Sequence, residues 1–120
     1  MPELNNAKFA FDNAIKLLND NNLKESVEQL NEIIKIEPNH IKSLNLLGDI
    51  YIKLNKPKES LHFVNKVLNI EKFNKLNLEK KYKLLLFLGN ESSSHETLEL
   101  LHKKHPSIST ARELSNYYLK

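Results

Sequence analysis

The chain has 120 residues and a formal net charge of +3, and 40% of its residues are hydrophobic while 28% are charged. This balance is typical of one globular domain, and no apolar run approaches the roughly 20 residues that cross a bilayer. Cysteine is absent and only Gly48 and Gly89 are glycines, which excludes disulfides, thiolate metal sites and glycine-rich phosphate loops. Glu3 and Asp12 stand where a signal peptide would be basic and then apolar, so we expect a cytoplasmic protein without membrane insertion.

Apolar residues recur at helical spacing along the whole chain, and the strict alternation typical of strands is absent. Leu44, Leu47 and Tyr51, for example, fall on one face of a helix. The spacing predicts helices over residues 4–20, 24–36, 40–54, 57–71, 75–88, 94–105 and 109–119. The expected fold class is therefore all-α.

Residues that end or begin helices separate these segments. The pairs Asn21-Asn22 and Asn55-Lys56 interrupt the pattern, and Pro57 suits a first helical turn, where its missing N–H is not needed. Gly89 is expected to end a helix with a positive φ. Two pairs resemble capping boxes, in which side chains satisfy the first N–H groups of a new helix: Ser93 with Glu96, and Thr110 with Glu113.

A period of 34 residues runs through the chain. The stretch "NNLKES" at 21–26 returns as "NKPKES" at 55–60, and Pro38 and Pro106 are two periods apart. A pair of antiparallel helices repeated at this spacing is typical of the tetratricopeptide repeat, and the sequence resembles that family along almost its whole length. The resemblance implies a right-handed superhelical α-solenoid formed by a single domain of residues 1–120. Its units fall at residues 7–40, 41–74 and 75–108, and a capping helix at 109–119 would cover the last apolar face.

The resemblance also implies where the helices of a unit touch. The family has small residues at its eighth and twentieth positions, which here hold Ala14 and Gly48, and then Ser26, Ser60 and Ser94. Tyr82 departs from this pattern, so we expect a wider gap between the helices of the third unit. The inward side of the capping helix is predicted to be Ala111, Leu114 and Tyr118.

In this family the first helices of successive units line a concave groove that binds a peptide or a helix of a partner protein. The groove positions carried over from the family are Lys8, Phe11, Asp12, Ile15, Lys42, Asn45, Leu46, Asp49, Ile52, Lys80, Lys83 and Phe87. Phe11, Leu46 and Phe87 are the expected apolar anchors, one in each unit. The alternative is that some of these residues pack against a neighbouring helix.

One subset of the family clamps the terminal carboxylate of chaperones with lysine, asparagine and arginine side chains. The matching positions here hold Phe11, Ile15, Leu46, Leu76 and Lys80. Only the last of these is basic, so we do not expect binding of chaperone tails. The expected function is non-catalytic protein binding, as an adaptor, an assembly factor or a chaperone-like module.

Other functions are less well supported. His95, Glu99 and His102 share a helical face near His105 and would offer zinc three ligands, but a solvated helix face is the expected explanation, so we expect no metal site. No catalytic motif occurs, so we expect neither an enzyme nor a cofactor. The basic residues are lysines except for Arg112, whereas base reading favours arginine, so specific nucleic-acid binding is not expected.

The charges are unevenly distributed. Residues 1–37 carry four lysines against seven carboxylates, and residues 72–120 carry nine basic side chains against five acidic ones. The alternative function is therefore a structural one, in which the acidic part of one copy meets the basic part of another. Such self-association would be weak and sensitive to salt, because exposed charges are screened.

Overall fold

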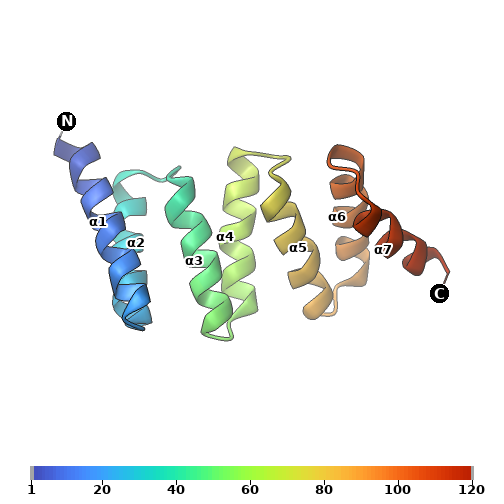
Figure 1. Ribbon diagram of the computed structural model, residues 1–120, viewed down its shortest axis with the longest axis horizontal. Helices are drawn as coiled ribbons and strands as arrows, with labels where there is room; N and C mark the ends of the chain where they lie inside the picture. The colour runs from blue at the N-terminus through green and yellow to red at the C-terminus, as the bar shows by residue number, and fades with distance from the viewer. Residues whose placement is uncertain (1, 120) are drawn as a thin grey trace.

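The computed structural model describes residues 2–119 of the chain, with side chains from residue 7 onward. Seven helices and no strand form in this part (Figure 1). The helices are α1 (Pro2–Asn19), α2 (Leu23–Ile36), α3 (Ile41–Lys53), α4 (Pro57–Ile70), α5 (Lys75–Phe87), α6 (Glu91–Lys104) and α7 (Ile108–Tyr118). The predicted all-α fold class is confirmed.

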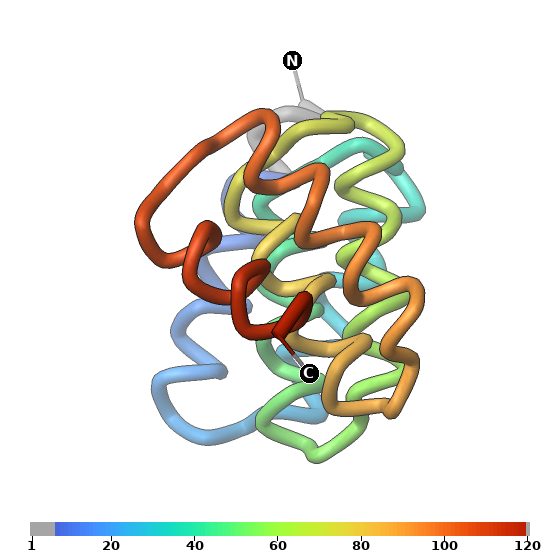
Figure 2. Tube along the Cα trace, turned by 90° about the vertical axis from the view of Figure 1, so that its right-hand side faces the viewer, coloured from blue at the N-terminus to red at the C-terminus, as the bar shows by residue number. Residues whose placement is uncertain are grey.

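The helices stand side by side in a row, and each packs mainly against its neighbours in sequence (Figure 1). The result is an elongated molecule of 53 × 29 × 21 Å, with α1 and α7 at opposite ends of the long axis. Seen from the α7 end, the first helices of the pairs lie toward one side of the row and the second helices toward the other (Figure 2). This is the repeat solenoid that the 34-residue period predicted.

Each first helix is followed, two positions after its last residue, by a residue with left-handed backbone conformation. These residues are Asn21, Asn55 and Gly89, with φ values of 64°, 60° and 81°. The N–H of the next residue then donates to a carbonyl in the last turn of the helix, as Lys56 does to Tyr51 over 2.8 Å. Asparagine tolerates this conformation better than most residues, so the same turn recurs every 34 residues without glycine at every position.

Within each pair, a buried serine ties the second helix to the first. The Oγ of Ser26 donates to the carbonyl oxygen of Ala14 over 2.8 Å, and that of Ser60 donates to Gly48 over 2.7 Å. The third serine, Ser94, reaches the carbonyl of Tyr82 over a longer 3.2 Å. The Tyr82 side chain extends out toward α7. The contact predicted at these positions is present in all three pairs, and it is longest in the third.

Two buried clusters hold the row together. The larger one joins α1, α2 and α3 and consists of Ala7, Ala14, Leu30, Ile33, Leu47 and Ile50. The smaller one joins α5 and α6 through Leu78, Leu98 and Leu101, with Leu114 of α7 packed partly against it. Burial of these apolar side chains is the main force that stacks one pair on the next.

The starts of the last two helices differ from the prediction. Asn90 caps α6 by accepting a hydrogen bond from the N–H of Ser93 over 3.3 Å. Ser107 caps α7 and forms a capping box with Thr110. Both caps therefore lie three residues before the predicted ones, and Ser93 and Thr110 donate their own N–H groups to Asn90 and Ser107 instead of capping the helices.

The inward face of α7 also differs in part from the prediction. Thr110 is buried and Leu114 is half-buried, whereas Ala111 and Tyr118 are exposed. The Nδ1 atom of His102 lies 2.6 Å from Oγ1 of Thr110, and this contact turns Thr110 rather than Ala111 toward α6. The prediction was right for Leu114 and wrong for Ala111, while Tyr118 contacts Glu99 of α6 but stays mainly in solvent.

Candidate peptide-binding groove

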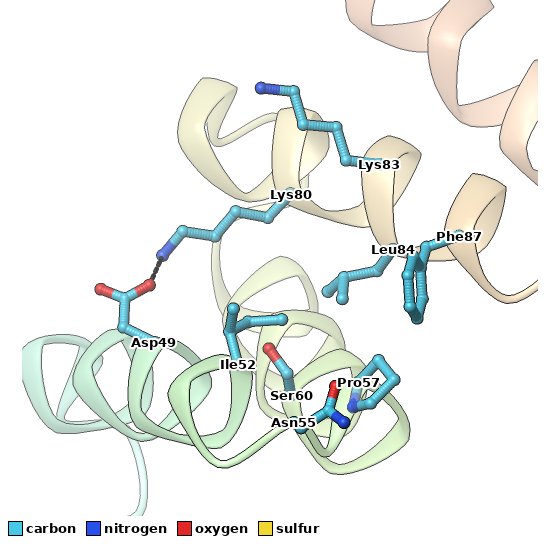
Figure 3. Close-up of a pocket in the computed structure, with 9 residues that line it drawn as sticks. All are labelled: Asp49, Ile52, Asn55, Pro57, Ser60, Lys80, Lys83, Leu84 and Phe87. Carbon is cyan, nitrogen blue, oxygen red and sulfur yellow. Dashed lines mark hydrogen bonds and ion pairs between the residues drawn. The ribbon is translucent and has the colours of Figure 1, made fainter.

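A cavity of about 440 Å³ opens between α3 and α5, with the turn into α4 at one end. Its lining consists of Asp49, Ile52, Asn55, Pro57, Ser60, Lys80, Lys83, Leu84 and Phe87 (Figure 3). Five residues predicted to line a groove gather here: Asp49, Ile52, Lys80, Lys83 and Phe87. They come from the second and third pairs, so the cavity lies where these two pairs meet.

The cavity has an apolar interior. Ile52 and Phe87 are large apolar side chains that remain 50% and 74% exposed, while Leu84 between them is buried. In Figure 3 these three side chains face the space between α3 and α5. Large apolar groups gathered in a hollow are typical of a binding surface rather than of an ordinary monomer surface.

Charged side chains stand at the open edge of the cavity. Lys80 Nζ donates to Oδ1 of Asp49 over 2.8 Å, which joins α5 to α3 (Figure 3). The Lys80 side chain is only 23% exposed, so its charge is held in place by this ion pair. Lys83 is exposed and, within residues 7–119, forms no ion pair. Lys83 is therefore a cation of the cavity lining that has no carboxylate partner among the described residues.

The groove residues predicted in the first pair do not reach this cavity. Phe11 is half-buried, and its ring lies edge-on to His40 with the ring centres 5.6 Å apart. Ile15 is half-buried, while Lys8 and Asp12 are exposed on α1. Phe11 and Ile15 are thus partly used for packing, as in the alternative interpretation, in which some of the predicted groove residues pack against a neighbouring helix.

The remaining predicted residues belong to α3. Leu46 is half-buried and packs against the larger cluster, and Lys42 is exposed outside the cavity. Asn45 accepts a hydrogen bond from the buried side chain of Asn77 over 3.0 Å, so it joins α3 to α5. Of the three expected anchors, Phe87 alone is mainly exposed, and Phe11 and Leu46 also contribute to packing.

Sequence reasoning missed four residues of the cavity: Asn55, Pro57, Ser60 and Leu84. The first three belong to the turn and to the second helix of the pair, whereas the prediction considered first helices alone. The Asn55-Lys56-Pro57 break in the helical pattern was the available signal, because the turn that forms there places Asn55 and Pro57 in the lining of the cavity.

The histidines considered as zinc ligands have separate partners. His95 Nε2 lies 3.0 Å from Glu99, His102 contacts Thr110, and His105 Nε2 lies 2.6 Å from the carbonyl oxygen of Phe73. Among the described residues no three potential ligands come together in a metal-binding arrangement. In the same part of the chain, no helix combines the length and hydrophobicity needed to span a membrane.

Comparisons with known proteins agree with this fold. Residues 41–74 match the tetratricopeptide repeat family, and these are the bounds placed on the second unit from the sequence. A search of the curated proteins finds no match.

Solved structures of similar fold share little sequence with the chain. A MamA protein has 13% identity and a TM-score of 0.83 over 98% of this chain, and the chain spans 64% of that protein's length. The first tetratricopeptide domain of Spaghetti (RPAP3), bound to the HSP90 peptide SRMEEVD, has 12% identity and a TM-score of 0.76. The match covers 93% of this chain and 90% of that domain. The TPR2B domain of yeast Sti1 in a pHsp70 complex has 20% identity and a TM-score of 0.72. The match covers 95% of this chain and 94% of that domain.

Proposed function

We propose that this chain, whose residues 41–74 match the tetratricopeptide repeat family, is a non-catalytic adaptor that holds a peptide or a helix of a partner protein in the cavity between α3 and α5. The observation that carries this proposal is the apolar hollow beside the exposed ring of Phe87. Two neighbours of similar fold are described with bound peptide partners, which supports the same class of function.

The ligand is expected to insert one large apolar side chain among Ile52, Leu84 and Phe87. Affinity in such complexes comes mainly from a few buried anchors, while charged neighbours orient the ligand. The free cation of Lys83 favours an acidic residue beside that anchor, because Lys80 is already paired with Asp49. The proposed ligand is therefore a segment with an apolar residue flanked by a carboxylate.

This recognition differs from the clamping of a chain terminus. The positions that hold a terminal carboxylate in the chaperone-binding subset are Phe11, Ile15, Leu46, Leu76 and Lys80 here. Phe11 and Leu46 pack partly against the protein itself, and Lys80 binds Asp49. We propose that an internal segment of the partner, rather than its terminus, occupies the cavity.

A peptide-display library selected on the immobilised chain tests the proposal. Selected peptides are measured by calorimetry against the parent, Phe87→Ala and Phe9→Ala. Phe9 is the matched control, because it lies on α1 and is 78% exposed while Phe87 is 74% exposed. Phe87→Ala should weaken binding by about 2 kcal/mol or more, and Phe9→Ala should leave it unchanged.

The melting temperature of both variants should stay close to that of the parent, since both rings are mainly in solvent. Equal binding by parent and Phe87→Ala would show that the ligand lies elsewhere on the solenoid. Recovery of peptides that depend on a free C-terminal carboxylate would instead support terminal clamping.

A further inference from the structure

A basic edge lies at the opposite end of α5 from the cavity. It consists of Lys72 and Phe73 in the turn between α4 and α5, Lys75 at the start of α5, and Lys103, Lys104 and His105 at the end of α6. Figure 1 shows the turn before α5 and the end of α6 on the same long side of the row. The proposed peptide cavity involves none of these residues.

Two contacts fix the turn against the end of α6. Lys104 Nζ lies 4.2 Å from the centre of the Phe73 ring, as in a cation–π pair. His105 Nε2 lies 2.6 Å from the carbonyl oxygen of Phe73, which makes Nε2 the donor. Residues 31 and 32 positions apart in sequence are thereby held as one surface.

The positive charge of this edge is not neutralised within the protein. Lys72, Lys75, Lys103 and Lys104 are exposed, and none forms an ion pair within residues 7–119. The one carboxylate in the turn is Glu71, which accepts a hydrogen bond from Asn74 over 2.9 Å. The edge therefore presents four lysines with their charges available to an external anion.

Helix stability accounts for only half of these lysines. Lys103 and Lys104 lie in the last turn of α6, where cations are favoured by the helix dipole. Lys75 is the first residue of α5, where a cation is unfavourable, and no acidic residue lies in that first turn. A local preference broken at an exposed position is a typical sign of a functional surface.

Apolar side chains are exposed beside these lysines. Phe73 is 44% exposed and Ile70, at the end of α4, is 37% exposed. Ile108 is 79% exposed and follows His105 by three residues, so it lies within about 10 Å of it along the chain. Protruding apolar groups among lysines combine the two attractions that an anionic membrane surface offers, which are its negative charge and its apolar boundary.

We propose that this basic edge binds the surface of an anionic lipid bilayer. Phe73 enters the headgroup layer, and Lys72, Lys75 and Lys104 surround it and contact the lipid phosphates and carboxylates. The peptide cavity stays accessible, because it opens at the other end of α5. The chain would thus bring a bound segment to a membrane surface without inserting a helix.

Other anionic partners fit the edge less well. Lysine without arginine lacks the bidentate geometry that nucleic-acid binding favours, and one face of the Phe73 ring is already covered by Lys104, which leaves less of it for base stacking. An acidic protein segment with an apolar anchor would need a hollow to receive that anchor, as at Phe87, and that cavity includes neither Phe73 nor any lysine of the basic edge.

Sedimentation of the full chain with lipid vesicles tests the proposal. The parent should bind vesicles of phosphatidylcholine with phosphatidylserine at low salt, and it should not bind phosphatidylcholine alone. The variant Lys72→Gln/Lys75→Gln/Lys104→Gln should bind on the order of a hundredfold less, because each lysine near an anionic surface contributes about a fivefold factor. Phe73→Ala should reduce binding severalfold at unchanged salt dependence.

The control is Lys53→Gln/Lys56→Gln/Lys58→Gln, which removes three exposed lysines around the turn between α3 and α4. Binding of this control should change little. An equal loss in both triple variants would show that only net charge matters and would overturn the proposal.

No binding of the parent to the anionic vesicles would also overturn it. So would tighter binding to a labelled single-stranded oligonucleotide than to vesicles, with loss in the same variants. The double variant Lys72→Gln/Lys75→Gln leaves the contact of Lys104 with Phe73 in place and should also show a large loss of vesicle binding. It therefore tests the proposal even if the triple variant does not fold. The peptide proposal can fail without changing these results, because the peptide cavity and the basic edge share no residue.

Discussion

The two ends of this short solenoid are held together by different forces. Around α1, α2 and α3, stacking depends on buried aliphatic side chains, and Leu30, Ile33 and Leu47 are almost completely excluded from water. At the other end, α7 contributes the half-buried Leu114 to a cluster of three buried leucines. The regular repeats are thus stabilised by apolar burial, and the last helix needs additional contacts.

Those additional contacts are polar and aromatic. Tyr118 donates to Glu99 over 2.5 Å, and the ring of His95 stacks on Tyr117 with the ring centres 3.8 Å apart. Tyr82, at a position where the first two pairs have a small residue, donates to Glu113 of α7 over 3.1 Å. A departure from the repeat pattern in the third pair therefore contributes to the attachment of the terminal helix.

The largest difference between the two ends should follow from truncating a leucine at each. Leu47→Ala removes a fully buried side chain and should lower the free energy of unfolding by about 2–5 kcal/mol. Leu114→Ala acts at a half-buried site and should cost less than Leu47→Ala. Urea denaturation followed by circular dichroism measures both. Equal losses would mean that α7 is part of the same cooperative core.

Gly48 tests how closely the helices of the regular middle pair approach. Gly48→Leu should lower the free energy of unfolding by about 1–3 kcal/mol, because a large side chain there overpacks the contact with Ser60 and Val64. Gly48→Ala should instead raise it by up to about 1 kcal/mol, since alanine favours helix and its Cβ would lie 3.7 Å from the Ser60 Oγ. Thermal melting of both variants checks whether the two substitutions change the stability in opposite directions. A Gly48→Leu variant as stable as the parent would show that the helices are further apart.

Much of this fold could be predicted because local rules and the repeat agree. The left-handed turns, the serine contacts and the helix pairs all recur at 34 residues, so each position supports the assignment of the others. The starts of α6 and α7 were misplaced because neighbouring asparagine, serine and threonine residues are all chemically able to cap a helix. Only the contact of Thr110 with His102, which depends on tertiary structure, distinguishes among them at α7.

The candidate site was less predictable for a similar reason. Helical periodicity indicates which residues leave the core, but Phe11 and Phe87 have comparable patterns and different surroundings. Phe11 meets His40, whereas Phe87 borders a hollow. Which apolar residue stays exposed depends on how the next pair is placed, and that placement follows from contacts such as Asn45 with Asn77 that no single-helix pattern contains.

A smaller effect should separate the serine contact of the middle pair from that of the third. Ser60→Ala removes a buried 2.7 Å hydrogen bond and should cost about 1 kcal/mol. Ser94→Ala removes the longer 3.2 Å contact with Tyr82 and should cost less. Chemical denaturation of the two variants in parallel provides the comparison. A larger loss for Ser94→Ala would show that the third pair is packed as tightly as the second.

The smallest expected effect is a pH-dependent loosening of α7. The hydrogen bond from Tyr118 holds the pKa of Glu99 below its ordinary value, so this contact stabilises α7 above that value and is lost as the pH falls through the lowered pKa. The same hydrogen bond raises the pKa of Tyr118 above 10.0, and burial followed by the bond to Glu113 raises that of Tyr82. These contributions are present below pH 10.0 and are lost as the pH rises through the raised pKa values.

Near-ultraviolet circular dichroism, which reports the packing of tyrosine rings, should therefore change at acidic and at alkaline pH while the helical signal remains. Tyr118→Phe should remove the acidic change, because the hydroxyl group that lowers the pKa of Glu99 is gone. Tyr51→Phe is the matched control, since the Tyr51 ring stacks on Phe63 in the larger cluster, with ring centres 5.6 Å apart, and lies far from α7 in sequence. If both variants keep the acidic change of the parent, the attachment of α7 depends on the burial of Leu114 and Thr110 instead, and the two ends of the solenoid are held by the same force.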